Sequence, residues 1–237
     1  MKSLALLALV PALATSVFAA DLGKLIFQDD FNRNESQETS DDPGNGWGTN
    51  SKARAKGDKQ VDLKDGVMRI CISSRADHAV SVTHPAEFTD GAVTLRFMLE
   101  DAKDSLGLDF ADLQCKEVHA GHLFVVKVDP KQVQLIDHKT GGMRLDIHDA
   151  RTGKKELTDE QKKALVGKVR NFPHATEVGK WHELQVKVEG DELSVAIDGQ
   201  AVGSFHSPGI AHPTKRMLRF SVPRNAVVDD VKIYRKS

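Results

Sequence analysis

Four side chains in the middle of the chain are of the types that acid–base chemistry uses. They are two carboxylates and two imidazoles, Asp109, His119, His122 and Asp137. Asp109 lies between apolar neighbours, and alternate residues of a strand face opposite sides, so its carboxylate should face away from the core. A carboxylate with a nearby histidine can bind sugar hydroxyls or transfer protons. The other interpretation is a solvated outer face, which antiparallel sheets commonly keep.

Two basic residues, Arg96 and Lys127, occupy the same kind of outward position in their predicted strands. With Asp109 and Asp137 they make up the predicted ligand-binding set. If the strand surfaces that carry them form one concave face, these four side chains would line it.

Several other chemistries have no support in the sequence. A retaining glycosidase needs two carboxyl groups about 5 to 5.5 Å apart, but Asp109 and Asp112 are three residues apart and would face opposite sides of a strand. His119 and His122 do not by themselves complete the four ligands of a zinc site. The chain has no Gly-x-Ser-x-Gly elbow of a serine hydrolase.

The elements that would position these residues are short strands. The clearest run is Trp181 to His206, where apolar and polar residues alternate twice around two reversals, Gly190-Asp191 and Asp198-Gly199. Asp-Gly tolerates the positive φ angles of a type I′ hairpin turn. This stretch therefore predicts a three-stranded meander.

Similar alternation over the rest of the chain predicts roughly a dozen short strands, the pattern of a sandwich or barrel. Met143 to His148 is one candidate strand. One inserted helix is predicted near 158–170, because Thr158 and Gln161 have capping-box spacing. The predicted fold class is all-β, with two antiparallel sheets in a jelly-roll sandwich.

The N-terminus has the pattern of a signal peptide over residues 1–20: Lys2, an apolar stretch from Leu4 to Val10 and a small-residue exit at Ala19-Ala20. We expect an exported protein, periplasmic or extracellular, whose residues 21–237 form a single domain. No later segment has the length of a membrane span. The charges nearly balance, with 33 basic and 34 acidic residues, so the sequence predicts no nucleic-acid partner.

Cys71 and Cys115 are the two cysteines of the chain. In an exported protein they could form one disulfide bridge. Equally, Cys71 could be a small apolar residue buried in a strand. The sequence leaves both alternatives open.

Several separated motifs together resemble one fold family. They are Phe27-Gln28-Asp29-Asp30-Phe31 with Trp47, Trp181-His182, Ile197-Asp198-Gly199-Gln200, Ser207-Pro208-Gly209-Ile210 and Val228-Asp229-Asp230-Val231-Lys232-Ile233. They resemble the concanavalin A-like, or laminin-G-like, jelly rolls of exported bacterial proteins, and most closely the 3-keto-disaccharide hydrolase-like domains. The resemblance implies two curved sheets and a concave face available for glycans.

The resemblance also suggests a use for two acidic pairs. Asp29, Asp30, Asp229 and Asp230 could converge on a structural calcium ion, which takes six to eight oxygen ligands. Alternatively, one aspartate of each pair accepts backbone donors at a strand end while the other is solvated.

Three functions are open at this stage. The first is an exported, carbohydrate-recognising jelly-roll domain. The second is a hydrolase acting on 3-keto-disaccharides or related sugars, with its acid or base among Asp109, His119, His122 and Asp137. The third is a non-catalytic surface or adhesion module.

Overall fold

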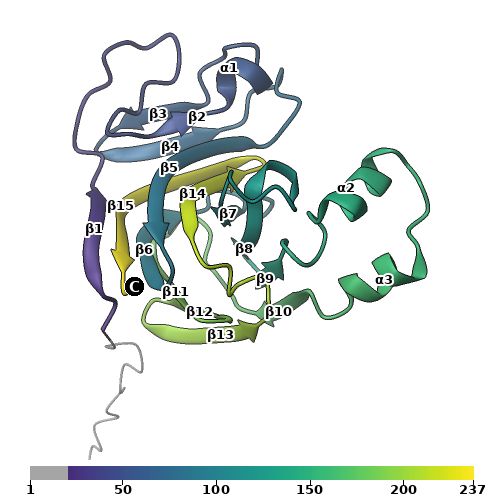
Figure 1. Ribbon diagram of the computed structural model, residues 1–237. Coiled ribbons are helices and arrows are strands. Elements are labelled where there is room, and N and C mark those ends of the chain that lie inside the picture. Colours follow the sequence, from purple (N-terminus) through teal and green to yellow (C-terminus); the bar gives the residue numbers. More distant parts are fainter. Residues whose placement is uncertain (1–20) are drawn as a thin grey trace, which may run out of the picture.

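The computed structural model describes residues 21–237, which form two antiparallel β-sheets around one apolar core (Figure 1). The predicted signal peptide, residues 1–20, lies outside the described residues. Within residues 21–237, no helix is long and apolar enough to cross a membrane.

Sheet A contains the meander and the C-terminal strand. Its order is β13 (Gln200–His206), β12 (Glu192–Ile197), β11 (His182–Glu189), β6 (Gly91–Met98), β15 (Asn225–Arg235), β4 (Val67–Cys71) and β3 (Val61–Lys64). β1 (Lys24–Asp29) pairs with the second half of β15, and β4 pairs with the first half. The first and last strands of the described chain are therefore neighbours.

Sheet B carries most of the residues for which the sequence predicts acid–base chemistry. Its order is β10 (Val169–Pro173), β9 (Gln132–Asp137), β8 (His122–Val128), β7 (Leu106–Ala111), β14 (Lys215–Val222), β5 (Val80–Phe88) and β2 (Gly48–Thr49). Short helical turns are α1 (Ser51–Arg54) and η1 (His119–Gly121), and two helices, α2 (Leu145–Thr152) and α3 (Asp159–Leu165), lie between β9 and β10.

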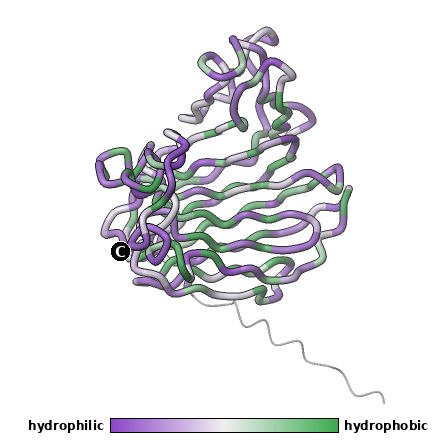
Figure 2. The backbone as a smooth tube through the Cα atoms, turned by 90° about the vertical axis from the view of Figure 1, so that its right-hand side faces the viewer, coloured by the Kyte–Doolittle hydropathy of each residue, from purple (hydrophilic) through white to green (hydrophobic). Residues whose placement is uncertain are grey.

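The period-two pattern determines which side chains enter the core. In Figure 2 hydrophobic and hydrophilic segments alternate along the strands. On β7, for example, Leu106, Leu108 and Phe110 are at most 1% exposed and belong to the core. Burying such side chains is the main favourable contribution to folding. The residues between them are left on the outer face of sheet B.

The predicted meander is confirmed in register and in its turns. Leu184, Val186 and Val188 of β11 pair with residues of both β12 and β6. Asp198 and Gly199 have φ angles of 52° and 73°, as a type I′ turn requires. The local sequence therefore predicts both the turn and the strands of this hairpin.

The inserted segment differs from the prediction. The Thr158–Gln161 capping box forms, but α3 ends at Leu165, ahead of Gly167 with its φ of +72°. The predicted strand Met143–His148 is instead largely α2. β10 occupies the edge of β9 that such a strand would need. The chain thus inserts two helices where we expected one.

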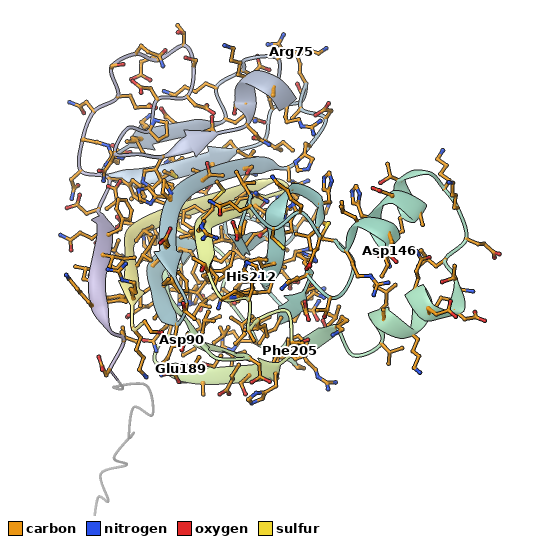
Figure 3. All side chains as sticks on the ribbon, in the orientation of Figure 1. Arg75, Asp90, Asp146, Glu189, Phe205 and His212 are labelled. Carbon is orange, nitrogen blue, oxygen red and sulfur yellow. The ribbon has the colours of Figure 1, made fainter. Side chains whose placement is uncertain are left out.

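The two helices project from the sandwich beside β9 and β10 (Figure 1). Gln161 Nε2 donates to the backbone oxygen of Asp146 at 3.0 Å, which ties α3 to α2. Asp146 itself stands on this projecting part (Figure 3). α2 buries only Ile147 and α3 buries no residue, so the insertion is held mainly by its ends.

Candidate functional site

The site is built on the three central strands of sheet B. Asp109 of β7 faces outward, as predicted, yet its side chain is only 4% exposed. Its cross-strand neighbours are Val125 on β8 and Arg219 on β14. A carboxylate so thoroughly removed from water requires partners.

Those partners are His122 and Arg219. Nδ1 of His122 is hydrogen-bonded to Oδ2 of Asp109, and Nη1 of Arg219 lies 3.5 Å from the same oxygen. Nη1 of Arg219 also lies 3.0 Å from Nδ1 and 3.1 Å from Nε2 of His122, so the guanidinium lies against the imidazole ring. We call these three residues the Asp109–His122–Arg219 cluster.

Local backbone irregularities position His122. The register between β7 and β8 shifts between Phe110 and Ala111, so that Ala111 pairs with His122. Ala120, in the turn before it, has a φ of 49°, which is uncommon for a residue other than glycine. Arg219 Nη2 donates to the carbonyl oxygen of Ala120 at 3.2 Å. Such irregularities recur where a fold re-aims a functional side chain.

Two further imidazoles lie near His122, and a third stacks on one of these two. The ring of His119 stacks on that of His148 from α2, with centroids 3.7 Å apart and planes 9° from parallel. The ring centroid of His122 lies 6.3 Å from that of His119 and 5.9 Å from that of His138. We call His119, His122, His138 and His148 the histidine cluster.

The surroundings of the histidine cluster disfavour protonation at two of its members. Burial lowers the pKa of His119, and the neighbouring imidazoles of His148 and His122 lower it further. Burial also lowers the pKa of His138, against the opposing effect of Asp109. Both groups therefore hold a proton less readily than an ordinary histidine.

Asp137 does not join this cluster through its carboxylate. It is fully buried and accepts hydrogen bonds from the Thr140 backbone at 2.9 Å, from the Ser207 hydroxyl at 2.5 Å and from the Gly209 backbone at 3.1 Å. Lys168 Nζ lies 3.5 Å away. The structure thus brings together Asp109, His119 and His122, whereas Asp137 fastens the end of β9 to the loop before β14.

The two predicted basic ligand-binding residues lie on different sheets. Lys127 is on the outer face of sheet B, one row of the sheet from Asp109. Arg96 is on β6 of sheet A, where its guanidinium lies 3.2 Å from Asp229 and 4.7 Å from the ring centroid of Trp181. Arg96 therefore does not share a surface with Asp109.

Three members of the two acidic pairs line one cavity, and a cation lies beside every one of the four aspartates except Asp30. Asp29, Asp30 and Asp230 line a cavity of about 540 Å³ on the side of sheet A. Burial would raise the pKa of Asp29, but the hydrogen bonds from Arg33 and other donors outweigh it and lower that pKa. Arg96 lies 3.2 Å from Asp229 and 3.6 Å from Asp230.

These carboxylates do not fit a calcium ligand set as they are arranged. Among residues 21–237, the group of three or more acidic, histidine or cysteine side chains with ligand atoms within 4.8 Å of one another is Glu35, Glu38 and Asp62. Lys59 Nζ already lies 2.6 Å from Glu35 and 2.8 Å from Glu38, in the place of a metal ion. A calcium ion needs oxygen ligands that no cation neutralises.

Both cysteines are free thiols. Cys71 lies on β4 of sheet A and is exposed, while Cys115 lies in the loop after β7 of sheet B. The bridge considered from the sequence is not formed, because Cys71 lies on a strand of sheet A and Cys115 lies in a loop that follows a strand of sheet B. Cys71 is not a buried apolar residue either.

Sequence reasoning missed three members of the site, Arg219, His138 and His148. Arg219 lies between the inward residues Leu218 and Phe220, so the sequence pattern predicts that its side chain faces outward. The pattern does not predict its partner, because His122 lies 97 residues away in the sequence.

Solved structures of similar fold include carbohydrate-active proteins. The chain resembles the β-glucanase of Bacillus licheniformis with a TM-score of 0.57 and 11% identity, over 90% of this chain and 99% of that chain. It resembles the laminarinase of Rhodothermus marinus with a TM-score of 0.56 and 13% identity, over 90% of this chain and 97% of that chain. It resembles the carbohydrate-binding module CBM66 of Bacillus subtilis with a TM-score of 0.51 and 15% identity, over 78% of this chain and 93% of that chain.

At these identities the similarity concerns the fold. The chain has the concanavalin A-like jelly-roll fold, as the sequence predicted. No protein-family model and no curated protein matches its sequence.

Proposed function

We propose that the chain is a carbohydrate-recognising jelly-roll domain whose binding surface is the outer face of sheet B. A row of small and hydrogen-bonding residues crosses five strands directly beside the Asp109–His122–Arg219 cluster. This polar row consists of Gln134 (β9), Lys127 (β8), Gly107 (β7), Ser221 (β14) and Ser81 (β5). It is the observation that carries the proposal.

The chemistry of the polar row suits sugar hydroxyls. Amide, ammonium and hydroxyl groups provide both donors and acceptors. Gly107 leaves a low floor between its neighbours, since a Cβ atom there would lie 3.2 Å from the backbone oxygen of Ser221. Lys127 forms no ion pair among the described residues, so its ammonium group is available to a ligand. The fold similarity to carbohydrate-active proteins adds support to a glycan partner.

A binding assay tests the proposal. The purified protein would be screened against neutral and acidic oligosaccharides on a glycan array, and hits measured by calorimetry. We expect Lys127→Ala and Gln134→Ala to weaken binding about tenfold each, the loss of one or two hydrogen bonds at a surface. Lys64→Ala, a lysine of sheet A that also has no ion pair among the described residues, is the matched control. No binding at millimolar ligand, or equal losses in Lys127→Ala and Lys64→Ala, would refute it.

A second candidate is a glycoside-processing enzyme acting on 3-keto-disaccharides or related sugars. It is favoured by one observation, the Asp109–His122 hydrogen bond, which fixes the orientation of an imidazole that could act as base. The cross-strand neighbours of Asp109 are not carboxylates, which disfavours the two-carboxylate mechanism at this centre. Full turnover by folded His122→Ala would remove this candidate.

Export of the protein is also a proposal. It is supported by the signal-peptide pattern of residues 1–20. Mass spectrometry of the protein recovered from the periplasm or medium should give a chain that begins at Ala20 or Asp21. Recovery of the chain with Met1 intact would contradict it.

A further inference from the structure

The histidine cluster is the least expected feature of the outer face of sheet B. Its members come from four different parts of the chain: the η1 turn, β8, the residue after β9 and α2. Stacking of His119 on His148 brings the inserted helix α2 against the η1 turn. Four titratable rings next to one another have no role in holding the apolar core.

The fixed charges around the histidine cluster nearly cancel. On the sheet, Asp109 is matched by Arg219, 3.5 Å away, and on α2 Asp149 Oδ1 lies 3.2 Å from His148 Nδ1. Asp137 is the third carboxylate near the cluster, where its charge acts to raise the pKa of His138. The ammonium group of Lys168 lies 3.5 Å from this carboxylate and balances its charge. Lys127 adds a cation one row away.

Acidification therefore makes this face positive. Each imidazole that gains a proton adds a charge, while the carboxylates facing the cluster, Asp109, Asp137 and Asp149, are already matched or exposed. Burial first, and the neighbouring imidazole of His122 after it, lower the pKa of both His119 and His138. A bound anion would favour the protonated form of each ring.

The histidine cluster is not arranged to bind a metal ion. The Arg219 guanidinium lies within 3.1 Å of both ring nitrogens of His122, so a cation already lies where a metal would bind. The stacked rings of His119 and His148 are parallel, and parallel stacked imidazoles do not direct their nitrogens at a common point.

We propose that the glycan bound at this face is acidic, and that the carboxylate of a uronate residue lies beside the histidine cluster while the rest of the sugar lies along the polar row. The proposal rests on the carbohydrate-binding function proposed above and adds the class of sugar. Binding then strengthens as the pH falls through the range in which the imidazoles take up protons, because a uronate remains ionised there. Neutral sugars lack this dependence.

A matched pair of ligands tests the proposal. Oligogalacturonide and its methyl ester share one backbone and differ in charge. We expect the dissociation constant of the acidic form to fall about tenfold from about pH 7.5 to about pH 5, the gain of two or three exposed charge contacts. The ester should change less than about twofold, because no ligand charge meets the new protons.

Variants of the cluster complete the test. His119→Asn combined with His148→Asn should abolish most of the pH dependence for the acidic ligand. His206→Asn is the control, since His206 is an exposed histidine of β13 on sheet A. If the double variant does not fold, the two ligands and two pH values with the unaltered protein still decide the question.

The outcomes separate the two proposals. Equal, pH-independent binding of acid and ester would overturn the acidic-glycan proposal and leave the carbohydrate-binding function standing. Binding of neither would overturn both. Binding of a sulfated oligosaccharide without binding of the uronate would overturn the assignment to a carboxylate. A pH dependence that survives in the double variant would remove the histidine cluster from the explanation.

Discussion

Replacing Asp137 by alanine should destabilise the protein strongly without acting on the binding face. The carboxylate is fully buried and accepts hydrogen bonds from Thr140, Ser207 and Gly209. Thr140 is half-buried and can turn its groups to water, whereas Ser207 and Gly209 are buried and would lose their acceptor. A buried donor without a partner costs about 1–3 kcal/mol.

Those two donors, with the ammonium group of Lys168 left near the vacated position, give an expected loss of about 3–5 kcal/mol in the free energy of unfolding. For a chain of this size that corresponds to a decrease of about 6–20 °C in Tm. Urea unfolding followed by circular dichroism measures the loss. Glu177→Ala, which removes an exposed carboxylate paired with Lys180, should change stability by less than about 0.5 kcal/mol.

The difference between Asp137→Ala and the unaltered protein should depend on pH. Burial would raise the pKa of Asp137, but the hydrogen bonds from Ser207, Thr140 and Gly209 outweigh it and hold the pKa below its ordinary value of 3.8. A lowered folded-state pKa contributes stability above the unfolded value, and that contribution is lost as the pH falls through the folded pKa. The difference should therefore be full at neutral pH and shrink below about pH 3.8.

Two results would refute this account. A loss below about 1 kcal/mol would mean that the donors find water or other acceptors. Unchanged stability with lost glycan binding would place Asp137 in the binding site after all. Gly209→Ala provides an independent check, because a Cβ atom there would collide with the Asp137 carboxylate and should destabilise the same junction.

Three further predictions concern stability. Burial lowers the pKa of Lys215 to about 8 from 10.5, so the unfolded chain binds more protons than the folded protein between these two pH values. The free energy of unfolding should therefore rise with pH across this range. Urea titrations should show this rise in the unaltered protein but not in Lys215→Met. Thr158→Ala should cost about 1 kcal/mol and increase amide exchange in α3, because it removes half of the capping box; unchanged exchange would contradict the role of the cap. Asp29→Ala should cost about 3 kcal/mol in thermal or urea unfolding, because Arg33 and the Trp47 indole lose a buried acceptor, and a neutral effect would mean that Arg33 is satisfied elsewhere.

The sandwich was predictable because its signals are local. Alternation in β7 places Asp109 outward, and alternation in β11 and β12 with the Asp198-Gly199 turn fixes the meander. The same pattern places Val133, Leu135 and Asp137 on one face of β9, so the inward direction of Asp137 was also present in the sequence. The helix cap at Thr158 is another short-range signal.

The site was not predictable beyond that point, because its contacts join distant segments. Arg219 reaches His122 only through the pairing of β14 with β7 and of β7 with β8. A register shift and the positive φ of Ala120 then aim the ring. His148 enters from a helix that the local sequence did not distinguish from a strand.

The sequence by itself determined which side chains face the core and which face outward, since that depends on a period of two along each strand. Only the tertiary structure decided which outward residues meet. It placed Asp109, His122 and Arg219 together, and it separated Arg96 on sheet A from Lys127 on sheet B. The pairing of strands that are distant in the sequence depends on the packing of the whole core, whereas within a hairpin the turn and the apolar pattern fix the register.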